Sequence, residues 1–141
     1  MKKFARVIII SAVILVLCLT LCACGNKYKS HYKAFLMTES NTSNSASVSF
    51  DTFSGVYVAK LNNSGNDKVV ISYNAKLEEG NIKVYYDFDD EKLSLFEIRT
   101  DGNVEGKTEA FTGNKIIYVI IEADDECSAG SFSFALEKAP Q

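Results

Sequence analysis

Two short acidic runs are the residues of this sequence best suited to chemistry. Residues 87–91 read DFDDE and residues 124–126 read DDE. Calcium takes six to eight oxygen ligands, so four carboxylates within five residues form a candidate cation site. Its candidate ligands are Asp87, Asp89, Asp90 and Glu91. The spacing does not fit an EF-hand loop, and we favour a solvated, charged turn that binds no metal.

A catalytic set is not recognisable. His31 is the one histidine, too few for a typical zinc site without other ligands placed by the fold. No Gly-x-Ser-x-Gly motif occurs, and Cys127 follows three acids that would raise the pKa of its thiol. We therefore interpret Cys127 as an inert, buried residue and expect neither an enzyme nor a cofactor.

Two tyrosines are candidates for a binding face. Tyr85 and Tyr118 fall on the less core-like side of their strands if side chains alternate between the two faces. Exposed tyrosines can stack on sugar rings, and aromatic residues are enriched in protein interfaces. Ordinary packing beneath the segment 28–37 is the alternative.

The elements that would position these residues are β-strands. Alternation of apolar and polar residues with a period of two, broken by turn sequences rich in Gly and Asn, predicts strands rather than helices. The eight predicted strands are 46–53, 55–61, 68–76, 81–88, 92–100, 104–111, 115–123 and 130–137. This number and spacing predict an all-β fold, an antiparallel two-sheet sandwich of the jelly-roll or immunoglobulin-like kind.

Two segments depart from simple alternation. The strand 115–123 is apolar on both faces, so it must be covered on both, either by residues 28–37 or by a partner protein. Residues 28–37 contain bulky side chains and could form a first edge strand. Residues 38–47 are nearly all Ser, Thr and Asn, which predicts a solvated loop.

The N-terminus has the order of an export signal: Lys2, Lys3 and Arg6, then an apolar run, then small residues. The run is short for a membrane span, so we expect a signal helix that is removed. Its end, the sequence LCAC over residues 21–24, resembles a bacterial lipobox. That resemblance implies a diacylglyceryl group on Cys24 and cleavage after Ala23. An uncleaved signal anchor and a secreted soluble protein are the alternatives.

Charge separates the chain into two parts. All 18 acidic residues and 12 of the 15 basic ones lie beyond residue 23, so that part has a formal charge of −6. An acidic domain of this kind excludes nucleic-acid binding driven by phosphate contacts. After cleavage and acylation only Cys127 would remain as a thiol, so the domain has no internal disulfide.

The lipobox, followed by the short motifs FSGVY at 53–57 and VISY at 70–73, resembles small uncharacterised surface lipoproteins of Firmicutes. The resemblance implies a Gram-positive host and an anchor on the outer face of the cell membrane. We expect a signal peptide over 1–23, a lipidated Cys24 with tether and entry segment over 24–45, and a β-sandwich over 46–138. The expected function is a non-enzymatic module that binds a glycan or an envelope protein. The alternatives are a small carbohydrate-active hydrolase or an accessory subunit of a membrane complex.

Overall fold

The computed structural model describes residues 27–63, 65, 67–87, 90–112 and 115–140, and nine antiparallel strands lie among them. The predicted signal helix lies outside these residues. The strands are β1 (His31–Phe35), β2 (Thr38–Asn41), β3 (Ser45–Asn62), β4 (Lys68–Glu79), β5 (Asn81–Asp87), β6 (Lys92–Arg99), β7 (Gly102–Lys107), β8 (Phe111–Thr112) and β9 (Ile116–Lys138).

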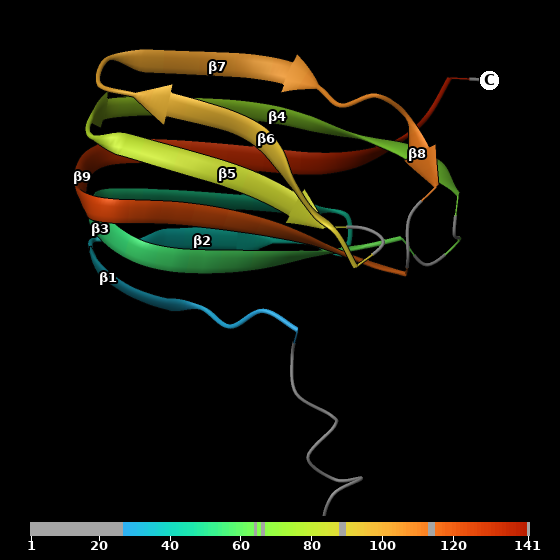
Figure 1. Ribbon diagram of the computed structural model, residues 1–141, viewed down its shortest axis with the longest axis horizontal. Coiled ribbons are helices and arrows are strands. Elements are labelled where there is room, and N and C mark those ends of the chain that lie inside the picture. Colours follow the sequence, from blue (N-terminus) through green and yellow to red (C-terminus); the bar gives the residue numbers. More distant parts are fainter. Residues whose placement is uncertain (1–26, 64, 66, 88–89, 113–114, 141) are drawn as a thin grey trace, which may run out of the picture.

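All nine strands belong to one hydrogen-bonded network that is folded over into two layers (Figure 1). We call the first layer sheet I; its order is β2, residues 45–53 of β3, residues 127–138 of β9, β4 and β7. Sheet II has the order residues 55–62 of β3, residues 116–123 of β9, β5 and β6. Strand β1 pairs with residues 52–56 of β3, at the bend between the two sheets. The predicted two-sheet antiparallel sandwich is therefore confirmed.

Five chain segments pass between the sheets at the left of Figure 1, which we call the closed end. The connections from β3 to β4 and from β8 to β9 also change sheet, at the opposite end. Strands β3 and β9 run through the closed end without interruption, and tight turns join β4 to β5 and β6 to β7. A residue with positive φ lies at four of the five crossings, and in β9 it lies just past the crossing, at Ala129. These residues are Leu36 (49°), Gly55 (104°), Gly80 (120°), Asp101 (58°) and Ala129 (49°).

The opposite end, which we call the open end, contains the loops between strands. It is held together by backbone hydrogen bonds between the two layers. The amide of Asn62 at the end of sheet II donates to the carbonyl of Ser43 beside sheet I, at 2.7 Å.

Strand β9 needs more residues than its neighbours to pass the closed end. Phe53 pairs with Cys127 and Gly55 pairs with Ala123, so residues 124–126 stand opposite the single residue Ser54. The extra length is a β-bulge, a common way to bend a strand sharply. The acidic run 124–126 is exposed because it occupies this bulge.

The core between the sheets is made by the inward-facing residues of the alternating pattern. Phe96 of β6 in sheet II stacks on Tyr73, Phe132 and Phe134 of sheet I, with ring centroids 5.0, 6.4 and 6.3 Å apart. Tyr86 of β5 similarly meets Phe111 of β8. Offset aromatic pairs add to the apolar burial that holds the layers together.

Several predicted strand boundaries were wrong. The segments 46–53 and 55–61 are one strand, and so are 115–123 and 130–137. Gly55 and the acidic run look like breaks in the sequence, but they bend a strand that continues. The predicted loop 38–47 was wrong as well, because its first four residues form β2 on the edge of β3.

The segment 28–37 does contain an edge strand, β1 on β3. The strands of the sandwich thus begin before residue 46, at His31. In β9, Ile117, Val119 and Ile121 face the core, whereas Tyr118 and Ile120 belong to the other face.

We predict that Gly55→Ala destabilises the fold by about 2–4 kcal/mol, because it combines positive φ with a backbone clash. A Cβ at Gly55 would lie 2.4 Å from the carbonyl oxygen of His31. Gly106→Ala is the control, since its Cβ would meet only the tip of Tyr73, a side chain that can shift. Denaturant unfolding of both variants measures the difference; equal losses would contradict this role for Gly55.

Candidate functional site

The outer face of sheet I carries a row of small polar side chains. Ser40, Ser47, Ser133, Asn74 and Glu105 stand opposite one another in register on β2, β3, β9, β4 and β7. Four strand spacings of about 4.8 Å make this row about 19 Å long. It crosses a shallow depression of about 560 Å³, which we call the serine groove.

The serine groove forms a shallow depression because the side chains at its centre are short. The next row towards the open end continues with Ser45, Ala135, Ser72 and Lys107. Serine hydroxyls both donate and accept hydrogen bonds. The hydroxyls of Ser47 and Ser72 lie 3.3 and 3.4 Å from backbone oxygens within the sheet, and that of Ser72 also hydrogen-bonds Glu137.

Opposite charges border the groove on β7 and β9. Nζ of Lys107 lies 2.7 Å from Oε2 of Glu137. Hydrogen bonds from Lys107, and then from Ser72, lower the pKa of Glu137 below its ordinary value. Glu137 is therefore ionised at neutral pH, and its charge is balanced by Lys107.

The two predicted binding tyrosines lie on the outer face of sheet II. Tyr85 pairs with Ile120 and Tyr118 pairs with Asp87, so the tyrosines are diagonal neighbours. Both are half-buried. We call Tyr85 and Tyr118, with the residues between them, the tyrosine face.

Other side chains already contact both tyrosine rings. Nζ of Lys92 lies over the Tyr85 ring, 4.3 Å from its centroid, and pairs with Glu122 at 2.5 Å. The ring of Tyr28 meets that of Tyr118 edge to face, with centroids 5.3 Å apart. The segment 28–37 thus supplies part of the predicted cover over the second apolar face of β9. A ligand that stacks on either ring would have to displace one of these contacts.

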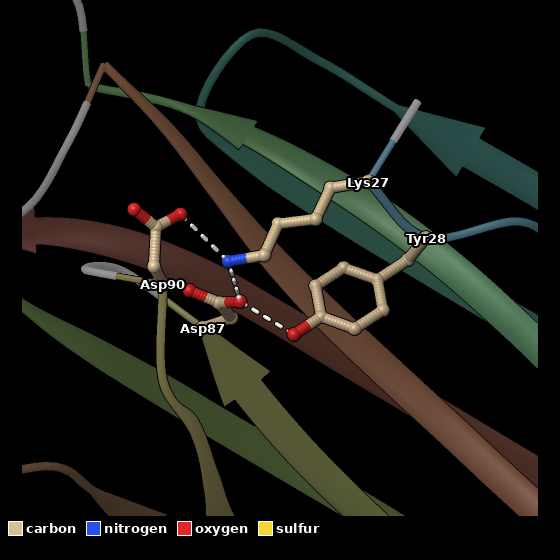
Figure 2. A network of polar contacts seen from close by, with 4 residues as sticks. All are labelled: Lys27, Tyr28, Asp87 and Asp90. Carbon is tan, nitrogen blue, oxygen red and sulfur yellow. Dashed lines mark hydrogen bonds and ion pairs between the residues drawn. The ribbon is translucent and has the colours of Figure 1, made fainter. Parts of the chain in front are cut away.

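A polar network, which we call the entry network, attaches the start of the described chain to the end of β5 (Figure 2). It consists of Lys27, Tyr28, Asp87 and Asp90. Nζ of Lys27 lies 2.6 Å from Oδ2 of Asp87 and 2.8 Å from Oδ1 of Asp90. The hydroxyl of Tyr28 donates to the same Oδ2 of Asp87, at 2.5 Å.

Asp87 is the buried member of the entry network, with a side chain only 3% exposed. Burial alone would raise its pKa. Hydrogen bonds from Lys27 and Tyr28 outweigh burial, so the pKa of Asp87 lies below its ordinary value of 3.8. The same contacts raise the pKa of Lys27, and burial followed by the Asp87 hydrogen bond raises that of Tyr28. The lysine is therefore charged and the phenol protonated at neutral pH.

The structure gives two of the calcium candidates a cationic partner instead. Asp87 and Asp90 both face Lys27, Glu91 is exposed, and Asp89 lies outside the described residues. Within the described ranges, no three Asp, Glu, His or Cys side chains gather as metal ligands do. The second acidic run, 124–126, lies at the closed end, far from Asp87 at the open end.

The remaining sequence candidates lie apart from one another. His31 is exposed on β1. Cys127 is buried, burial raises the pKa of its thiol, and its Sγ contacts the carbonyl oxygens of Asn81 and Asp125 at 3.5 Å. Cys24 lies outside the described residues, and the part of the chain that the structure describes contains no helix able to cross a membrane.

Comparison with known proteins gives a likeness of fold. No protein-family model matches the chain, and a search of curated proteins finds no match. TmCBM61 in complex with β-1,4-galactotriose is similar, with a TM-score of 0.50 and 13% identity over 82% of this chain and 92% of that one. A family 29 carbohydrate-binding module has a TM-score of 0.42 and 18% identity over 79% and 74% of the two chains. The structural neighbours thus include β-sandwich carbohydrate-binding modules.

Sequence reasoning missed both the serine groove and the entry network. The alternating serines at 45, 47 and 49, and again at 131 and 133, were a signal for a polar outer face. Their alignment with Asn74 and Glu105 depends on strand register. Lys27 and Asp87 are 60 positions apart in the sequence, so no local sequence pattern predicts their contact.

We predict that Asp87→Asn lowers the free energy of unfolding at pH 7 by about 1–3 kcal/mol, because Lys27 loses its buried counter-charge. The folded pKa of Asp87 lies below 3.8, so its contribution is complete well above that pH and is lost as the pH falls through and below it. The gap between parent and variant should therefore close under acid. Denaturation curves from pH 7 to pH 2 measure it.

Glu122→Gln is the matched control, because it removes a more exposed ion pair with Lys92 on the same sheet. Its cost should be about 0–1 kcal/mol. An Asp87→Asn cost no larger than that of the control, or one that grows in acid, would contradict the assignment.

Proposed function

We propose that this protein is a non-enzymatic glycan-binding module, held on the outer face of a bacterial cell membrane by a lipid on Cys24. The observation that carries the binding proposal is the serine groove. It offers hydroxyl, amide and carboxylate groups in register across five strands. Such a row suits an extended chain of sugar hydroxyls, which donate and accept hydrogen bonds repeatedly.

The charge of the groove favours a neutral glycan. Lys107 and Glu137 neutralise each other at its border. The remaining groove side chains are mostly short and uncharged, with Glu105 as the exception at one edge. An anionic or cationic polymer would find no uncompensated cluster of opposite charge there.

The shared fold supports the same proposal. TmCBM61, whose structure contains β-1,4-galactotriose, aligns with most of this chain. Fold alone does not determine function, so the serine groove rather than the likeness identifies the site.

The acid–base properties of the groove support binding rather than hydrolysis. A glycosidase needs one carboxylic acid with a raised pKa to protonate the leaving oxygen. The pKa of Glu137 is lowered by Lys107, which makes it unsuited to that role. The small envelope hydrolase therefore remains the less supported alternative.

A second candidate function is docking of an envelope protein on the tyrosine face, as an accessory subunit would do. Half-buried Tyr85 and Tyr118 flank the buried Ile120 on the outside of sheet II. Tyrosines around an apolar centre, with charged Lys92 and Glu122 at the border, resemble the composition of protein interfaces.

We predict that Ser133→Trp weakens glycan binding at least about tenfold, because the indole would fill the centre of the serine groove. Asn74→Ala should weaken it about two- to tenfold through loss of hydrogen bonds. A glycan array on the parent protein, followed by calorimetry with the best neutral oligosaccharide, measures both effects. Assay of reducing ends in the same mixtures tests hydrolysis.

Tyr85→Ala and Tyr118→Ala are the controls, since they alter the opposite outer face and should leave binding unchanged. Loss of binding in these variants but not in Ser133→Trp would move the site to the tyrosine face. Release of reducing ends by the parent would favour the hydrolase instead.

The anchor proposal has its own test. Cys24→Ser should abolish incorporation of labelled fatty acid and release the protein from the membrane fraction, because two acyl chains supply stable anchoring. Ala23→Ser, which keeps a small residue before the cleavage site, is the control. Unchanged labelling and membrane retention in Cys24→Ser would refute lipidation of this residue.

A further inference from the structure

The described chain is attached to the open end of the sandwich from its first residues. Lys27 and Tyr28 both bind the buried carboxylate of Asp87 (Figure 2). Two residues later, Oγ of Ser30 accepts a hydrogen bond from the amide of Val58, at 2.9 Å. Residues 27–30 are therefore fixed on sheet II before β1 begins, rather than forming a spacer.

The distance from Cys24 to this attachment is short. Three residue steps separate Cys24 from Lys27, so their Cα atoms are at most about 11 Å apart even in extended chain. If the chain were fixed only from Ser30, six steps would allow about 21 Å. The entry network thus halves the reach of any group attached to Cys24.

Charge distinguishes the two ends of the sandwich. The closed end is strongly acidic among the described residues, with Lys33 and Arg99 as neighbouring cations; its acids are Asp51, Glu78, Glu79, Asp101, Asp124, Asp125 and Glu126. The open end is close to neutral among the described residues, because its six lysines accompany six acids. The lysines are Lys27, Lys29, Lys68, Lys92, Lys115 and Lys138, and the acids are Asp67, Asp87, Asp90, Glu91, Glu109 and Glu137. Lys27, Lys92 and Lys138 each form an ion pair. Anionic lipid attracts lysines near its surface and repels carboxylates.

We propose that the open end of the sandwich docks on the lipid surface and that the entry network holds it there, with the closed end pointing away. This inference rests on the lipid anchor of the proposed function. The partner is the anionic headgroup layer of the membrane in which Cys24 is anchored. Strand lengths of about eight residues place the closed end about 25 Å farther from the lipid. Both outer faces, with the serine groove and the tyrosine face, then stand side-on to the membrane.

The test compares the depth of two labels in the full-length protein, purified from membranes and reconstituted into vesicles of phosphatidylcholine and phosphatidylglycerol. Lys68→Cys puts a fluorophore at the open end and Asp125→Cys puts one at the closed end; Cys127 is buried and stays unlabelled. A nitroxide on the lipid headgroups quenches nearby fluorophores. We expect at least about threefold stronger quenching at 68 than at 125, given the separation of about 25 Å.

Breaking the entry network should reduce this difference. Asp87→Ala, or the milder Lys27→Gln that keeps the bond between Tyr28 and Asp87, should bring the two quenching efficiencies closer. Glu122→Gln is the control and should preserve the difference. Vesicles of phosphatidylcholine alone should weaken it, because the lipid then no longer repels the acidic closed end.

The outcomes separate the two proposals. Equal quenching at both positions in acylated parent protein would overturn the docked orientation and leave the anchor intact. Stronger quenching at 125 would reverse the orientation. Parent protein without acyl label would overturn the anchor, and the orientation with it. A preserved difference in both Asp87→Ala and Lys27→Gln would remove the entry network from the explanation.

Discussion

The structure depends on one constraint: five chain segments must turn from one sheet to the other at the same end. Each has a residue with positive φ at or just past the turn, a conformation that is easy for Gly55 and Gly80 and costly for Leu36. Leu36 is also 70% exposed, so burial of its side chain gives little compensation. The cost of these backbone conformations is offset instead by packing between the two sheets that the bends bring together, where Phe96 stacks on Phe132 and Phe134.

Alternation along the sequence predicted the fold class well, because alternation requires one buried and one solvated face on each strand. It failed at the bends. Gly55 and residues 124–126 have the composition of loops, yet the hydrogen-bond ladder between β3 and β9 resumes on both sides of them. The partner strand decides whether a polar or glycine-containing segment ends a strand or bends it. The identity of that partner cannot be predicted from the local sequence.

Alternation also predicted some parts of the candidate sites and missed those that depend on strand pairing. Tyr85 and Tyr118 could be assigned to one face because both lie on regularly alternating strands. The serine groove needs the registers of β2, β3, β9, β4 and β7 together. The entry network needs the path of a segment that looks like a spacer, and its central residue, Asp87, had been assigned to a solvated turn. The buried Asp87 carboxylate instead binds Lys27 and Tyr28, and so attaches the start of the described chain to β5.

The closed end also limits where this chain can accept inserted residues. Binding proteins built on sandwiches commonly vary long loops at the end that faces their target, because loops tolerate insertion and substitution. In this protein the closed end has bends in continuous strands and turns of one or two residues, and inserting residues there would shift the register of both sheets at once. A binding module docked through its open end would therefore gain new specificity by exchanging side chains on its outer faces, one residue at a time, with the backbone unchanged.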